Sequence, residues 1–125
     1  MTPILVTYLE NNAKSDRWRL ERSITYETIV GKVTVPRGYI TDFASVPVLL
    51  WGIFPPIGRS NRATILHDWW YDNRLFEEEY GAKEARRLAD SNLLMMLNLI
   101  EPKKKVRNYI MYLACRWCGK SWWDN

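Results

Sequence analysis

Apolar and polar side chains alternate with a period of two over the first part of the chain, as expected of half-buried strands. The alternating segments are residues 4–9, 17–21, 24–30 and 33–35. Gly31-Lys32 is a turn signal, and Pro36 ends the last segment. We therefore predict a small antiparallel β-meander over residues 1–37, with one of its faces covered.

Residues 60–125 have apolar positions at helical spacing instead. A first helix is predicted from Ser60 or Asn61, since either residue suits a helix start, to about Asn73. A second helix is expected after Gly81, over about 82–99, and forms an antiparallel hairpin with the first. A third helix runs from Pro102 to Gly119, and its apolar residues at helical spacing are Val106, Ile110, Leu113, Ala114 and Trp117.

Between these parts, residues 38–59 form a segment with many prolines, glycines and apolar residues. Such a long connection in a compact domain is uncommon, and its apolar content favours an ordered loop. Its most apolar stretch, Val46 to Ile57, is far shorter than the roughly 20 residues of a membrane-spanning helix. Met1 to Leu9 lacks a basic n-region, so we expect no secretion signal.

The predicted architecture is therefore α+β: a β-meander (1–37), a long ordered loop (38–59) and three C-terminal helices (60–125). The 125 residues fit a single domain, 1–125.

His67 is the only histidine in the chain, and Asp68 follows it directly. Helical spacing places His67 on the same face as Leu66 and Trp70, so its ring points inward and needs a partner. If the first two helices form a hairpin centred near residue 78, His67 lies 11 positions before the centre and Asp90 lies 12 after it. We therefore predict a His67–Asp90 contact that fixes the tautomer of His67 and raises its basicity.

Three interpretations of this pair remain open. The two side chains form a catalytic dyad, or they specify the packing of two helices, or they belong to a structural metal site. Asp68 lies about 100° further round the helix, toward a groove where the loop with Asp42 could pass. Two carboxylates with loop carbonyls are a candidate calcium or magnesium site.

Several classes of chemistry are excluded by what the chain lacks. One histidine is too few for His-Asp metallophosphohydrolases, and there is no Gly-x-Ser-x-Gly elbow or Gly-rich phosphate loop. Cys115 and Cys118 form a Cys-x-x-Cys pattern late in a helix, where two buried thiols are expected rather than a redox pair or a zinc site. A Cys-His nucleophile site stays open in principle, but nothing in the sequence places either cysteine near His67.

Charge and aromatic content suggest partners without naming them. A net charge of +4 permits weak attraction to nucleic acid or anionic lipid, but no specific nucleic-acid partner is expected. The Lys103–Lys105 run is expected to be a solvated helix face rather than a phosphate-binding patch. Seven tryptophans, seven tyrosines and three phenylalanines suggest that some aromatics lie at an interface. The candidates are Trp51 and Phe54 in the loop, and Trp122 and Trp123 in a tail that docks on this domain or on a partner.

The segments "VPRGYITDFASVP", "PPIGR", "ATILHDWWYDN" and "ARRLADSNLLMM", in this order, resemble a family of small proteins of tailed bacteriophages and prophages known as a domain of unknown function. The resemblance covers Val35 to about Met96 and implies a phage origin. It supplies no activity.

A second resemblance runs from Asp42 to Asp90 and is to secreted phospholipases with a His-Asp pair. It implies His67 as general base, Tyr71 and Asp90 as the residues that orient it, and Asp68 as a calcium ligand, with carbonyls from the Asp42 loop. The chain lacks the glycine-rich cation loop and the disulfides typical of those enzymes.

The expected function is therefore a phage-encoded, virion-associated hydrolase acting on a lipid or another envelope ester, with calcium as its cation. Its expected location is the virion or the host cytoplasm. The alternative is a non-catalytic structural or adaptor component of the phage head or tail, in which the His-Asp pair is internal scaffolding. Inhibition of a host protein is a third hypothesis. The oligomeric state is not predicted.

Overall fold

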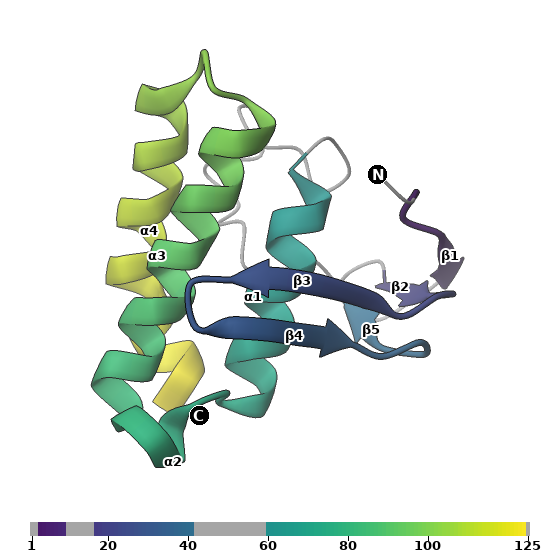
Figure 1. Cartoon of the computed structure of the whole chain (residues 1–125), viewed down its shortest axis with the longest axis horizontal. Helices are drawn as coiled ribbons and strands as arrows, with labels where there is room; N and C mark the ends of the chain where they lie inside the picture. The colour runs from purple at the N-terminus through teal and green to yellow at the C-terminus, as the bar shows by residue number, and fades with distance from the viewer. Residues whose placement is uncertain (1–2, 10–16, 42–59, 125) are drawn as a thin grey trace.

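The computed structural model describes residues 3–9, 17–41 and 60–124, apart from the side chains of residues 121 and 122. Strands come first in the chain and helices follow (Figure 1), so the predicted α+β class is confirmed. The strands are β1 (Val6–Leu9), β2 (Arg17–Leu20), β3 (Ile24–Thr28), β4 (Gly31–Val35) and β5 (Ile40–Thr41). The helices are α1 (Asn61–Asn73), α2 (Glu77–Tyr80), α3 (Ala82–Ile100) and α4 (Lys105–Asp124).

The strands do not form one meander as predicted, but two small antiparallel sheets. One sheet has the order β1-β2-β5, and β5 lies in the part of the chain that was predicted to be loop. The other sheet is the β3–β4 hairpin, in which Thr28 pairs with Gly31. Its turn therefore consists of Ile29 and Val30, and the prediction of a turn at Gly31-Lys32 is wrong, since both residues belong to β4. The Thr28 hydroxyl accepts a hydrogen bond from the Val30 backbone N–H in this turn.

The β3–β4 hairpin packs against the helices, as Figure 1 shows. Its inward residues Tyr26, Val33 and Val35 are buried in the hydrophobic core. The Tyr26 hydroxyl donates to the Arg62 carbonyl on α1 at 2.8 Å. On the α3 side, the Ile29 backbone N–H donates to the Asn92 amide oxygen at 3.1 Å. Polar contacts thus fix the hairpin over both helices.

Helix α3 runs antiparallel to both α1 and α4 and contacts both of them (Figure 1). The bounds of α1 agree with the predicted 60/61–73, and those of α3 agree with the predicted 82–99. The α1 face predicted to be buried is buried, and it consists of Ala63, Leu66, His67, Trp70 and Tyr71. Among the helices that the structure describes, none has the length and apolar character needed to cross a bilayer.

Helix α4 departs from its predicted bounds, because it starts at Lys105 and continues past Gly119 to Asp124. Gly119 is therefore not a helix stop. It lets Tyr71 approach α4 closely, since a Cβ added at Gly119 would lie 2.6 Å from the Tyr71 hydroxyl oxygen. The three lysines at 103–105 are exposed, as a solvated helix start requires.

Candidate functional site

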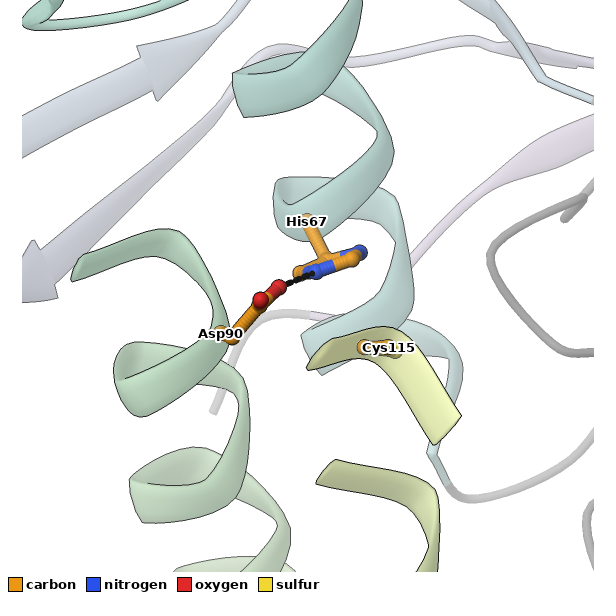
Figure 2. A group of neighbouring side chains, drawn as sticks. All are labelled: His67, Asp90 and Cys115. Atoms are coloured by element: carbon orange, nitrogen blue, oxygen red, sulfur yellow. Dashed lines mark hydrogen bonds and ion pairs between the residues drawn. The ribbon is translucent and has the colours of Figure 1, made fainter. Parts of the chain in front are cut away.

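His67 on α1 and Asp90 on α3 meet in the interior, and the contact predicted between them is present. His67 Nε2 lies 2.7 Å from Asp90 Oδ1 (Figure 2). The side chains are 3% and 0% exposed, respectively. The antiparallel packing of α1 against α3 creates this contact, since it brings residues equidistant from the connection face to face.

Asp90 has more donors around it than the histidine alone. The Tyr71 hydroxyl donates to Oδ1 at 2.6 Å, and Arg116 Nη1 on α4 donates to Oδ2 at 2.8 Å. Arg86, one helical turn before Asp90, places its Nη1 3.6 Å from Oδ2. Burial raises the pKa of Asp90, but the hydrogen bonds from His67, Tyr71 and Arg116 outweigh it and hold this pKa below the ordinary 3.8. Asp90 is therefore a buried, ionised carboxylate near neutral pH.

The ionised carboxylate determines the tautomer of His67. A carboxylate only accepts hydrogen bonds, so Nε2 is the protonated ring nitrogen and donates to Asp90. In the neutral ring Nδ1 then has a free lone pair. Nδ1 is buried and has no hydrogen-bond partner among the described residues. A nitrogen held in this tautomer is suited to accept a proton.

Tyr71 stabilises this arrangement from one turn further along α1. Its ring lies 4.4 Å from the His67 ring, and it packs edge-on against Trp123 at 5.0 Å. Burial raises the pKa of Tyr71, and the neighbouring charge of Asp90 raises it further, so its hydroxyl stays protonated. Tyr71 is thus a hydrogen-bond donor to Asp90, in the orienting position that the resemblance implied.

Cys115 on α4 is the unexpected neighbour. Its sulfur lies within 4.8 Å of donor atoms of His67 and Asp90, whereas the sequence had placed neither cysteine near His67 (Figure 2). Burial raises the pKa of the Cys115 thiol well above its usual value, and the charges of Asp90 and Asp68 add to this. The expectation of two buried thiols is wrong for Cys118, which is exposed, and correct for Cys115.

The fit of a metal ion can be judged at two places. His67, Asp90 and Cys115 offer three ligand types, but Tyr71 and His67 already occupy one oxygen of Asp90 and Arg116 occupies the other. Two guanidinium groups near one carboxylate also disfavour a divalent cation. This cluster therefore does not fit a metal site.

At the second place, Asp68 is buried and its Oδ2 accepts a hydrogen bond from the Thr41 hydroxyl at 2.7 Å. Both groups are oxygen donors of the kind that calcium binds, but calcium takes six to eight oxygens. The described residues thus supply a fragment of such a site and do not complete it. Asp42 lies outside the described residues.

The structure describes only some of the four aromatic residues that were predicted to lie at an interface. Trp51 and Phe54 lie outside the described residues, and only the backbone of Trp122 is described, within α4. Trp123 is 2% exposed, so it does not form a surface for a partner. Of the two alternatives for the tail, docking on this domain is the one that the structure shows for Trp123.

Residues 18–115 match a family described as "Protein of unknown function (DUF1353)". The chain belongs to this family. The matched region includes His67, Asp68, Tyr71, Asp90 and Cys115, and it ends before Trp117. No curated protein and no solved structure matches the chain.

Three residues of this cluster were missed by sequence reasoning: Arg86, Cys115 and Arg116. Arg86 had a local signal, because it lies four positions before Asp90 on the same helix. Cys115 and Arg116 had none, since their positions depend on how α4 packs against α3.

Proposed function

We propose that this DUF1353 chain is a hydrolase in which His67 is the general base and Asp90 orients it, acting on a lipid or another envelope ester. The observation that supports this most is the state of His67: Nε2 is held by Asp90, while Nδ1 is buried without a described partner. A purely structural histidine would leave a buried polar atom unsatisfied, at a cost of roughly 1–3 kcal/mol. A base requires this free lone pair.

The proposed reaction uses water as the nucleophile. Nδ1 of His67 removes a proton from the water, whose oxygen attacks the carbonyl carbon of the ester. The resulting tetrahedral intermediate breaks its bond to the alcohol oxygen, and His67 returns the proton to that leaving alcohol. Asp90 stabilises the imidazolium formed in between, because its charge lies 2.7 Å from Nε2.

Cys115 is a less suitable nucleophile than water. A thiol attacks carbonyls as the thiolate, and burial raises the pKa of Cys115 well above its usual value. The two mechanisms are separated by the variants Cys115→Ala and Cys118→Ala, of which the exposed Cys118 is the matched control. Under the water mechanism both variants retain ester hydrolysis.

Calcium enters the proposal as a cofactor to be tested. Asp68 and Thr41 offer two hard oxygen donors on one side of the helix that holds His67. No step above is routed through the ion, so dependence on calcium and dependence on His67 are separate results.

The proposed biological setting is a phage particle, with the protein in the virion or the host cytoplasm. It is supported by the order of the Thr-Asp-Phe-Ala-Ser-Val-Pro, His-Asp-x-x-Tyr and Ala-Asp motifs, which resembles proteins of tailed phages and prophages.

The test is fatty-acid release from liposomes of bacterial lipids by wild type, His67→Gln and Tyr39→Phe, each with calcium and with chelator. Tyr39 donates to Asp72 away from the dyad, so Tyr39→Phe serves as the control for mild perturbation. We expect release by wild type and the control and a loss of about 100-fold or more in His67→Gln. Circular dichroism establishes that each variant is folded.

Folded wild type that releases no fatty acid with or without calcium would contradict the lipid hydrolase. Release that persists in folded His67→Gln would contradict the role of His67 as the base.

The second candidate is a non-catalytic adaptor in the phage particle, and a specific observation favours it. The outer face of α4 exposes large apolar side chains, including Trp117 at 87%. His67 and Asp90 are also nearly inaccessible, which suits internal scaffolding. In that case wild type releases no fatty acid from liposomes with calcium or with chelator, and the function depends on binding through the outer face of α4.

A further inference from the structure

The outer face of α4 has a row of exposed apolar side chains, here called the α4 stripe: Val106, Ile110, Leu113 and Trp117. Their exposed fractions are 78%, 41%, 41% and 87%, respectively. The intervals between them are four, three and four residues, which is the spacing of the apolar seam in helix–helix pairs. Large apolar side chains gathered on one exposed face mark an interaction surface more often than scattered ones do.

The opposite face of α4 forms the contacts of the fold. Asn108, Met111 and Cys115 are buried there, against the helices that hold His67 and Asp90. The α4 stripe therefore adds nothing to the described core, and an apolar seam exposed to water is available to another molecule.

Charge limits what this molecule can be. Exposed lysines precede the stripe at 103, 104 and 105, and exposed Lys120 follows it. The one acidic residue of α4, Asp124, pairs with Lys120 at 3.3 Å. A second copy packed antiparallel along the stripe would place the 103–105 lysines near Lys120 of the other copy, and such like charges repel. The surface instead complements a partner with acidic residues beside an apolar seam.

The spacing of the stripe favours a helix over a flat membrane. Ile110 and Leu113 at its centre are about half as exposed as Val106 and Trp117 at its ends. Beside the centre, the rings of Tyr109 and Tyr112 stack with centroids 5.6 Å apart. Intervals of four, three and four residues let the stripe interdigitate with the apolar seam of a second helix, as in surfaces that bind amphipathic helices.

We propose that the α4 stripe docks an amphipathic helix of a partner protein whose apolar seam is flanked by Asp and Glu. This proposal does not rest on the hydrolase, because the stripe lies on the side of α4 that faces away from Cys115. It assigns the chain a binding surface with a defined class of partner.

The test uses the full chain and a synthetic, fluorescently labelled peptide of about three heptads, with Leu at the a and d positions and Glu at e and g. Binding is measured by fluorescence anisotropy and compared with the same peptide carrying Lys at e and g. We expect the Lys peptide to bind about tenfold or more weakly, and added salt to weaken the Glu peptide. Leu113→Glu and, independently, Trp117→Glu should each weaken binding of the Glu peptide about tenfold or more.

The matched control is Ile40→Glu, which changes an exposed apolar residue of β5, a strand that lies across α1 from α4 in Figure 1. It should leave peptide binding unchanged, and all three variants should melt as wild type does.

Three results would overturn the proposal. The first is equal binding of the Glu and Lys peptides. The second is a dimer in sedimentation experiments that Leu113→Glu dissociates, which would make a second copy the occupant. The third is co-sedimentation with phosphatidylglycerol vesicles without binding of the Glu peptide, which would make the stripe a lipid surface. Liposome hydrolysis is measured on Leu113→Glu in parallel, so failure of this proposal and failure of the hydrolase are separate outcomes.

Discussion

The two faces of α4 differ in chemistry although they belong to one continuous helix. The inner face places Cys115 and Arg116 beside the hydrogen-bonded pair of His67 and Asp90. The outer face exposes Val106, Leu113 and Trp117 to water. Polar and charged groups are thus enclosed while large apolar groups are exposed, which is the reverse of the usual distribution.

This inversion is the contrast on which both proposals depend. Three hydrogen-bond donors and the nearby Arg86 compensate the burial of Asp90, whereas exposing Trp117 leaves apolar area in water. Proteins keep such features at sites that act on or bind other molecules. Each of the following experiments tests one side of the contrast.

The largest effect is expected from Asp90→Ala. It would leave the buried His67 and the partly exposed guanidinium of Arg116 without the carboxylate that both contact, and breaking such a buried pair typically costs about 3–5 kcal/mol of unfolding free energy. Urea unfolding followed by circular dichroism measures this. The control is Asp124→Ala, which removes an exposed carboxylate near the end of α4 and should cost less than about 1 kcal/mol. Equal losses in both variants would mean that the buried cluster has no special energetic weight.

Two tryptophans on α4 allow a direct comparison of its faces. Trp123→Ala removes a fully buried ring that packs on Tyr71, and should cost about 3–5 kcal/mol. Trp117→Ala removes a ring that is 87% exposed, and should change stability by less than about 0.5 kcal/mol. Thermal melts of the two variants decide the matter. A large loss in Trp117→Ala would show that the α4 stripe is part of the core and not a binding surface.

Gly119→Ala is expected to have an intermediate effect. The new methyl group would lie 2.6 Å from the Tyr71 hydroxyl oxygen, and this ring is held by Asp90 and Trp123. Such overpacking costs about 1–3 kcal/mol. Lys120→Ala, at the next position and exposed, is the control and should be nearly neutral in denaturant titrations. If Gly119→Ala is as stable as the control, Tyr71 is less tightly fixed than its contacts indicate.

Tyr71→Phe removes one hydrogen bond from the Asp90 carboxylate and leaves the others. We expect a loss of about 1–2 kcal/mol, since the acceptor is charged and buried. Tyr39→Phe removes a similar bond of 2.6 Å to the exposed Asp72, and its loss should be clearly smaller. Denaturation midpoints compare the two. Similar losses of unfolding free energy in the two variants would mean that burial does not strengthen the hydrogen bond to Asp90.

The smallest and most gradual effect is expected from acid. The pKa of Asp90 is lower in the folded chain than its ordinary 3.8, so its contribution to stability is full above that value. This contribution is lost as pH falls below about 4 toward the folded-state pKa. Unfolding free energies of wild type and Asp90→Asn, measured from pH 6 to pH 3, should converge at the acid end. If the two curves stay parallel down to pH 3, protonation of Asp90 is not the cause of the loss of stability in acid.

Much of the secondary structure followed from local pattern. The bounds of α1 and α3 were predicted within one residue, since the apolar spacing lies inside each segment, although no side chain caps the start of either helix by a hydrogen bond. The strands were placed well, but their grouping was not. The meander prediction missed β5 and the division into two sheets, because pairing of Trp18 with Thr41 depends on a long connection and not on local alternation.

The candidate site was likewise predicted only in part. The His67–Asp90 contact followed from the hairpin, because two helices with a short connection have few ways to face each other. The inward position of Tyr71 followed from its four-residue spacing to His67. Arg116 and Cys115 could not be predicted, since helix α4 can present either of two faces to α3 and both contain large side chains.

The sequence by itself determined the α+β class, the helices and the pairing of His67 with Asp90, because periodicity and short connections are local constraints. Only the tertiary structure decided that α4 turns Asn108, Met111 and Cys115 inward and the row from Val106 to Trp117 outward. The apolar spacing that predicts a helix does not specify which face is buried. That choice depends on the fit to α1 and α3, where Gly119 admits Tyr71 and Arg116 neutralises Asp90.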